Sequence, residues 1–218
     1  MRLKLFFITC FIIISVNSFS QISIGFKNGL NFSNVKYDDL KTEKLIKDYK
    51  KIKSGVNLGI VSLYRMNPIL SLQLEINYSQ KGYKYNQIQY IKGKKKINYL
   101  EIPFFGKYKL NKSKINILNF YLGGFFAYMI NGKDVFTEYP STEKRTNKFD
   151  FNNPNYKYNR IDFGANIGFN FEYISKKRIS QVDIRYTHSL VADSKEVADA
   201  LLSRVFTISY SFLFSRKK

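Results

Sequence analysis

The stretch IDFGANIGFNFEY, residues 161–173, alternates apolar and polar side chains without a break. Its apolar positions are Ile161, Phe163, Ala165, Ile167, Phe169, Phe171 and Tyr173. Because successive side chains of a β-strand point to opposite faces, this pattern predicts a strand with one oily face and one polar face. Two kinds of fold contain such strands. In a soluble sandwich the polar face meets water, and in a membrane barrel it faces the lumen.

Seven other stretches predict strands, which gives eight in total. The stretch 69–80 alternates as cleanly as 161–173, whereas 115–130 leaves its two faces undecided because most of its residues are apolar. The predicted strands are residues 21–33, 55–64, 69–80, 97–110, 115–130, 161–173, 179–190 and 204–214. Each is long enough to cross a bilayer, since a tilted strand needs only about 9 to 11 residues.

The connections between these strands are by turns long and short. The short ones are four-residue hairpin turns at 65–68, 111–114 and 175–178, and the long ones are 34–54, 81–96, 131–159 and 189–203. Strict alternation is typical of an outer-membrane barrel, which has short periplasmic turns and long outer loops. Open strand edges are not viable in lipid, so the first and last strands should pair. We therefore predict an all-β fold, a closed eight-stranded antiparallel up-and-down transmembrane β-barrel.

The first twenty residues have the features of a secretory signal peptide. Arg2 and Lys4 precede an apolar run at 5–16, and small residues lie just before Gln21. This run is too short for a membrane helix, which needs roughly 20 apolar residues. We expect export and cleavage after Ser20, which leaves one barrel domain at 21–218. That domain has no cysteine, because the single cysteine of the chain lies in the signal peptide, and this excludes disulfides and thiolate metal sites.

The chain is strongly basic, with a formal net charge of +20. Such a charge is typical of nucleic-acid binders, but here the lysines concentrate in the predicted loops rather than on a helix face, and an exported protein rarely meets nucleic acid. We expect no nucleic-acid partner. Outer-membrane lipids are the expected partners instead, with loop lysines on lipopolysaccharide phosphates. The second loop contributes Lys92, Lys94, Lys95 and Lys96.

Four segments carry a resemblance to a known family. They are GFKNGLNFSN at 25–34, YLEIPFFGKY at 99–108, FYLGGF at 120–125 and DIRYT at 183–187. In these segments the chain resembles the PorT-like outer-membrane β-barrel family of the Bacteroidetes. The resemblance implies an eight-stranded barrel in the outer membrane of a Gram-negative bacterium. The founding member is implicated in secretion, which makes secretion-machinery proteins candidate partners.

An eight-stranded barrel has an interior just wide enough for side chains to fill, so we expect no general pore. The alternation places eight charged side chains inside: Lys27, Glu75, Glu101, Lys107, Asp162, Glu172, Asp183 and Arg185. Isolated charges in a confined interior are costly, so these groups should pair. We predict a salt-bridge network centred on Arg185 with Glu75 or Asp183. Its expected role is a structural plug, and the alternative is a proton or ion path.

Pro103 and His188 are the remaining candidates for a special role. Pro103 lacks an amide donor and predicts a bulge or an unpaired point in its strand. His188 precedes Ser189, but neighbours on a strand point to opposite faces, and the sequence contains no nucleophile elbow. We therefore expect His188 at the barrel rim and no catalytic residue, cofactor or metal. The predicted role is structural, interaction or secretion-accessory. The alternatives are a narrow transporter for a small hydrophobic or ionic solute and, less favoured, a membrane-embedded enzyme.

Overall fold

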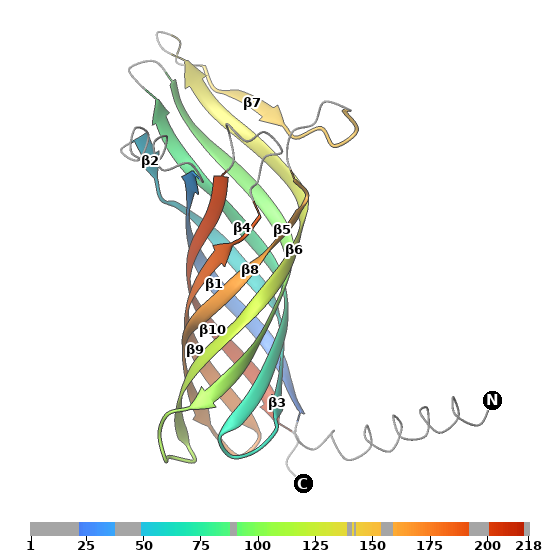
Figure 1. Ribbon diagram of the computed structural model, residues 1–218, viewed down its shortest axis with the longest axis vertical. Coiled ribbons are helices and arrows are strands. Elements are labelled where there is room, and N and C mark those ends of the chain that lie inside the picture. The colour runs from blue at the N-terminus through green and yellow to red at the C-terminus, as the bar shows by residue number, and fades with distance from the viewer. Residues whose placement is uncertain are drawn as a thin grey trace, which may run out of the picture.

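The computed structural model describes residues 22–37, 49–87, 91–138, 141, 143–153, 159–191 and 201–215. The strands run steeply around one long axis, and some of them project well beyond the others at the upper end of the view (Figure 1). The predicted signal peptide and the predicted cleavage after Ser20 fall outside the described residues. Among the described residues, no helix is long and apolar enough to cross a membrane.

Eight long strands form a closed antiparallel ring. They are β1 (Ile22–Tyr37), β3 (Lys53–Arg65), β4 (Leu70–Gln87), β5 (Ile91–Lys109), β6 (Asn116–Glu138), β8 (Ile161–Ile174), β9 (Arg178–Ser189) and β10 (Leu201–Ser215). Each pairs with its neighbour in the chain, and β1 pairs with β10 along 23–37 and 201–215, which closes the ring. The predicted fold class is confirmed.

The two faces of the strands have the polarity of a membrane barrel. On β8, Phe163 is half exposed on the outside, whereas Asn166 and Asn170 are fully buried on the inside. The other ring strands repeat this inverted distribution, with large exposed apolar side chains outside and buried polar ones inside. Such a surface is stable in lipid and would aggregate in water. The alternation at 161–173 therefore belongs to a barrel and not to a sandwich.

The faces of β6, which the sequence left undecided, are now assigned. Tyr121, Phe125 and Met129 point into the lumen and are buried, whereas Leu122 and Phe126 lie exposed on the outside. Both faces are apolar because the upper lumen contains a hydrophobic cluster in place of polar groups. This is why the sequence of β6 does not alternate between apolar and polar residues.

Short side-chain caps hold the hairpin turns. In the turn after β3, Asn67 Oδ1 accepts hydrogen bonds from the backbone N–H groups of Ile69 and Leu70 at 2.8 and 2.7 Å. In the turn after β5, Ser113 Oγ accepts the N–H of Asn116 at 3.0 Å. Asn and Ser favour such local bonds to the backbone, which explains why these four-residue turns form.

The predicted long loops at 81–96 and 131–159 were wrong for much of their length. There β4 and β5 continue as a paired hairpin up to 87 and 91, and β6 continues to 138. Two short strands add to this outer sheet: β2 (Lys50–Lys51) pairs with β4, and β7 (Arg145–Lys148) pairs with β6. We call this part the extension. It comprises β2, β7, residues 81–87 of β4, 91–98 of β5 and 131–138 of β6. It forms because backbone pairing continues after the apolar band ends.

Two irregularities lie at the base of the extension. Gly82 has a φ of 128°, and a side chain there would press against the carbonyl oxygen of Lys95. Between Asn98 and Tyr99 the register of β5 against β6 shifts by one residue. A glycine with positive φ and a bulge both bend a strand locally. Together they re-aim the extension relative to the barrel wall (Figure 1).

Pro103 marks an unpaired point, as the sequence predicts. The β4–β5 ladder runs without change of register on both sides, but Glu75 and Ile76 have no partners opposite Pro103 and Ile102. On the other edge of β5, Pro103 is paired with Phe125 of β6. A missing amide donor thus interrupts one ladder and leaves the wall otherwise continuous.

Candidate functional site in the barrel lumen

The middle of the lumen is occupied by a cluster around Glu75. Arg185 Nη1 and Nη2 donate to the two carboxylate oxygens of Glu75 at 3.0 and 2.8 Å, in a bidentate arrangement. Lys27 Nζ donates to the same oxygens at 3.1 and 2.9 Å. Gln73 and Asn77, two residues away on either side, complete the shell at 2.7 and 2.8 Å. Glu75 is therefore the centre of the network, although the sequence placed Arg185 there.

Asp183 supplies the second negative charge of this cluster. Its Oδ1 lies 3.3 Å from Arg185 Nη2 and 3.7 Å from Lys27 Nζ, and it accepts a hydrogen bond from Ser209. Two cations thus face two carboxylates, so the cluster is neutral. Neutral pairing makes buried charges tolerable, because removal from water costs several kcal/mol per ion.

Aromatic rings hold the Arg185 guanidinium in place. Its Nε donates to the hydroxyl of Tyr121 at 3.2 Å, and its Cζ lies 4.7 Å from the centre of the Phe105 ring. Phe105 and Tyr121 stack on each other at 4.6 Å. Arg commonly binds aromatic faces and carboxylates together because its guanidinium is flat. Sequence reasoning missed Tyr121, since the faces of its strand were undecided.

A second cluster lies toward the hairpin turns. Lys107 Nζ donates to Glu172 Oε1 at 2.6 Å, and Arg65 Nη2 donates to Glu172 Oε2 at 2.7 Å. Lys107 also donates to Asn170 and Gln73 at 2.7 and 3.0 Å. Through Gln73, which also donates to Glu75, this cluster joins the middle one. The sequence assigned Arg65 to a turn and so did not count it among the inward charges.

A third cluster lies toward the extension. Lys81 Nζ is 2.6 Å from Glu101 Oε2 and 3.7 Å from Asp162 Oδ2. Ser189 Oγ donates to Asp162 at 2.9 Å. Lys81 was missed because the sequence placed it at the start of a loop. The inward parity of 71–79 continues to 81, and this signal could have found it.

All eight sequence-predicted lumen charges are buried, and the structure brings them into these three clusters with Lys81 and Arg65 added. The clusters together contain five cationic and five anionic side chains. They are Lys27, Arg65, Lys81, Lys107 and Arg185 with Glu75, Glu101, Asp162, Glu172 and Asp183. The charge is thus balanced within the set of three clusters.

Two apolar clusters share the lumen with the charged groups. The one near the hairpin turns consists of Val61, Leu63, Ile179 and Leu213, with Ile174 packed against it. The one near the extension consists of Ile97, Tyr99, Phe125, Ala127 and Met129, with Phe149 and Phe151 packed against it. Apolar and charged side chains share the same levels of the lumen, since Val61 is paired with Glu75 and Lys81 Nζ lies 4.5 Å from the centre of the Phe125 ring. The inward side chains of both kinds are buried.

Two of the ion pairs span the whole width of the bore. In the ring order β1, β3, β4, β5, β6, β8, β9, β10, the strands β4 and β9 are four places apart and so lie opposite each other. Glu75 is on β4 and Arg185 is on β9. The same holds for Arg65 on β3 and Glu172 on β8. Each pair is therefore a strut across the lumen.

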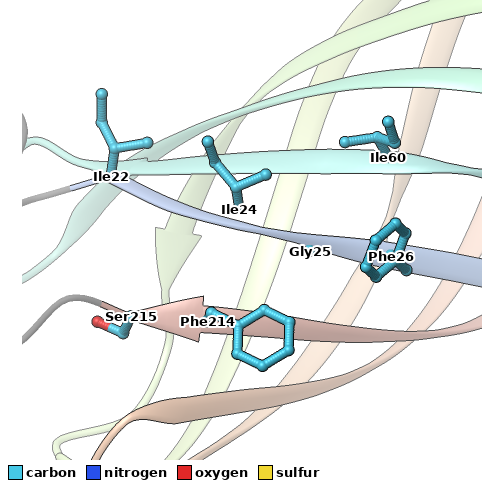
Figure 2. A pocket seen from close by; sticks show the side chains of 7 residues that line it. All are labelled: Ile22, Ile24, Gly25, Phe26, Ile60, Phe214 and Ser215. Atoms are coloured by element: carbon cyan, nitrogen blue, oxygen red, sulfur yellow. The ribbon is translucent and has the colours of Figure 1, made fainter.

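His188 and Ser189 do not form a catalytic pair. His188 lies on the outer face of β9, stacked on Tyr186 at 6.3 Å between ring centres, whereas Ser189 points inward to Asp162. Across the described part of the chain, no three His, Cys, Asp or Glu side chains are grouped to hold a metal ion. A shallow apolar groove lies instead on the outside of the barrel near its closing seam, lined by Ile24 and Phe26 of β1 and Phe214 of β10 (Figure 2). It faces lipid and is separate from the lumen.

The chain was compared with protein families and with solved structures. Residues 17–192 match the family model described as outer membrane protein beta-barrel domain. Solved structures similar to this chain include Ail, the attachment invasion locus protein of Yersinia pestis, at 16% identity and a TM-score of 0.41, covering 88% of this chain and 97% of that one. OprG from Pseudomonas aeruginosa is similar at 13% identity and 0.45, covering 90% and 95%. Neisserial surface protein A is similar at 12% and 0.42, covering 88% and 97%.

No curated protein matches the chain. The family match covers more than half of its length and includes β1 to β9 of the ring. Together with the closed antiparallel ring, the match identifies a small barrel of the Gram-negative outer membrane. The chain belongs to the outer membrane protein beta-barrel domain family.

Proposed function

We propose that this protein is a non-conducting outer-membrane barrel with a structural or interaction role, whose lumen serves as a rigid plug. The observation that carries the proposal is the Glu75–Arg185 strut, with its bidentate contacts of 2.8 and 3.0 Å across the bore. A conducting path would need mobile water along the axis. Here the central charges bind each other, and two clusters of buried apolar side chains pack among them.

The interaction role rests on the extension. A rigid scaffold that presents an outer element is a common arrangement for binding, and the extension continues beyond the apolar band. The resemblance to the PorT-like family supports a secretion-accessory version of this role. Export with cleavage after Ser20 is part of the same proposal, since a barrel reaches the outer membrane only after export.

A conductance measurement tests the plug. The parent protein, inserted in planar bilayers, is expected to give no open-channel current, with heat-dependent gel mobility showing that the inserted barrel is folded. A steady ion current that changes in Glu75→Gln would contradict the plug and favour the narrow transporter. Because Glu143 is exposed outside the lumen, Glu143→Gln is the matched control for the loss of one carboxylate.

A crosslinking experiment tests the interaction role. The parent protein and a variant without 83–95 are crosslinked in intact outer membranes and purified. Secretion-machinery proteins recovered with the parent and absent from the variant would support the secretion-accessory role. Recovery of lipid alone would restrict the role to a structural one, and equal recovery of the same proteins with both would remove the extension from the proposal.

A further inference from the structure

The outward face of the extension carries two rows of lysines directly opposite one another. In the first row, Lys84 of β4 is paired with Lys51 of β2 on one side and with Lys94 of β5 on the other. In the second row, Lys133 of β6 is paired with Lys96 of β5 and with Lys148 of β7. The rows adjoin, because Lys94 of the first row and Lys96 of the second lie two residues apart on the same face of β5. We call these six residues the lysine rows.

Within the extension, no carboxylate lies on the face that carries the lysine rows. The acids of the extension are Asp134 and Glu138, and both belong to the opposite face of the sheet. Asp134 accepts the hydroxyl of Tyr85 at 2.9 Å, and Glu138 lies 3.4 Å from Arg145. Within the described part of the chain, none of the six lysines forms a salt bridge.

Like charges directly opposite each other on neighbouring strands destabilise a sheet. The pKa of Lys96 shows this repulsion, since it is lowered by partial burial and by the charges of Lys94 and Lys133. A scattered set of surface lysines would avoid such contacts. Here six lysines are aligned in two rows on five adjacent strands. An anion bound above the rows would offset the repulsion between them.

The height of the rows indicates which anion. Leu100 and Tyr128 are paired, exposed apolar residues at the upper edge of the lipid-facing band. Asn98 and Asn131 follow, joined by a 2.7 Å hydrogen bond, and Lys96 comes next on the same face. Four strand positions separate Lys96 from Leu100, about 10 Å along a tilted strand. That distance reaches the headgroup layer that lies outside the hydrocarbon core.

The face itself is also continuous with the membrane-facing wall. The lysine rows have the same outward parity as Leu100 and Tyr128, so they face the surrounding leaflet and not the mouth of the barrel. We propose that the lysine rows bind the phosphate groups of outer-leaflet lipid, as in the bisphosphorylated glucosamine headgroup of lipid A. Rows of ammonium groups on neighbouring strands match two phosphates carried on one rigid headgroup, and each ammonium acts as a point charge on phosphate.

This proposal is independent of the closed lumen, since it requires only an outer-membrane position. It also corrects the expected lipid contacts. Lys94 and Lys96 belong to the rows, and Lys92 lies on the same face, but Lys95 points to the other face and is buried near the ring of Tyr83. The four lysines lie on strand β5 and not in a loop.

The test uses the full mature barrel in detergent with bisphosphorylated lipid A as the probe, and bound lipid is counted by native mass spectrometry. The variant Lys96→Gln/Lys133→Gln/Lys148→Gln removes one row. Its matched control, Lys112→Gln/Lys114→Gln/Lys177→Gln, removes three exposed lysines from turns at the other end of the barrel. We expect the row variant to lose at least about tenfold in lipid A affinity, given the contribution of each basic residue near an anionic surface. The control is expected to match the parent.

Lipid A without phosphates separates charge from acyl-chain binding, and inorganic polyphosphate separates lipid from soluble anions. The proposal expects the parent to bind dephosphorylated lipid A weakly. Equal lipid A affinity in parent and row variant would overturn the proposal, and so would a row variant that loses only polyphosphate. Folding is checked in parallel, and the row variant should be at least as stable as the parent without lipid because repulsion is relieved. If that variant fails to fold, Lys51→Gln/Lys84→Gln/Lys94→Gln provides the same test with the other row.

Discussion

The lumen and the outward face of the extension are both rich in charge, but they neutralise it in opposite ways. In the lumen, Glu75 lies within 3.1 Å of both Lys27 and Arg185, and the three clusters together contain five cationic and five anionic side chains. On the extension, Lys96 faces Lys133 with no carboxylate on the same face. The comparison teaches that charge density alone does not reveal function. Charges balanced inside the protein serve its structure, whereas charges left unbalanced require something from outside.

The largest effect is expected from Glu75→Gln. This substitution leaves Lys27 and Arg185 buried with Asp183 as their only carboxylate, and breaking a buried pair in this way costs about 3 to 5 kcal/mol of unfolding free energy. The loss is measured by urea unfolding in lipid vesicles. Because the chain has no tryptophan, unfolding is followed by gel mobility and not by tryptophan fluorescence. A loss no larger than that of the exposed control Glu143→Gln would show that the strut does not hold the wall.

A smaller effect is expected from Lys107→Met. The methionine retains most of the volume, but Glu172 keeps only Arg65 and Gln181 as donors, and Asn170 and Gln73 each lose a bond. A buried polar group left without its partner costs roughly 1 to 3 kcal/mol. The same unfolding assay measures it. Arg65→Met is the comparison, because its side chain is 30% exposed and a solvent-screened pair contributes about 1 kcal/mol or less. A larger loss of unfolding free energy in Arg65→Met than in Lys107→Met would contradict the assignment of Lys107 and Glu172 as the buried pair.

Tyr121→Phe removes one hydroxyl from the middle cluster. The ring that stacks on Phe105 is kept, but the acceptor of the Arg185 Nε–H is lost, together with the long 3.4 Å bond that the hydroxyl donates to the carbonyl of Ile184. A net hydrogen bond of this kind contributes about 0.5 to 1.5 kcal/mol. A loss in this range is expected in the same assay, with Tyr173→Phe on the lipid face as a control of about zero effect. A stabilised Tyr121→Phe protein would show that the contact is not used.

The smallest effect concerns the pH dependence of the extension. Lys96 has a pKa below its ordinary value of 10.5, so the folded protein binds this proton less tightly than the unfolded chain does. Stability should therefore rise with pH between the lowered pKa and 10.5, and this part of the rise should be absent in Lys96→Gln. Unfolding in detergent free of lipid A, repeated across that range, gives the difference. A parent and variant with identical slopes would show that the lysines do not repel each other.

Much of the barrel is predictable from the sequence, because alternation depends on a single physical rule. The eight ring strands, their closure and the inward direction of residues such as Glu75 and Arg185 all follow from parity and from the lipid environment. The centre of the network was harder to predict. Parity gives the face of a residue but not which side chains meet across the bore, and that depends on ring order and strand tilt.

Other features were missed because the apolar half of the alternation ends before the strands do. Lys81 and Arg65 were assigned to a loop and a turn, although the inward parity of 71–79 continues to 81. The extension was missed for the same reason: its strands are polar on one face and mixed on the other, so the apolar period ends at about residue 98 although pairing continues. Lysine is common both in loops and in outer strands, and only the register reveals the rows.

A double-mutant cycle on each region tests the contrast most directly. The coupling free energy is measured from unfolding of the two single variants and the double variant, for Glu75→Gln with Arg185→Gln and for Lys96→Gln with Lys133→Gln. The first pair is expected to couple favourably, on the order of 3 kcal/mol, because it is buried and bidentate. The second is expected to couple unfavourably in the absence of lipid A, by a few tenths of a kcal/mol. Couplings of the same sign in both regions would contradict the distinction between an internally balanced lumen and an externally balanced face.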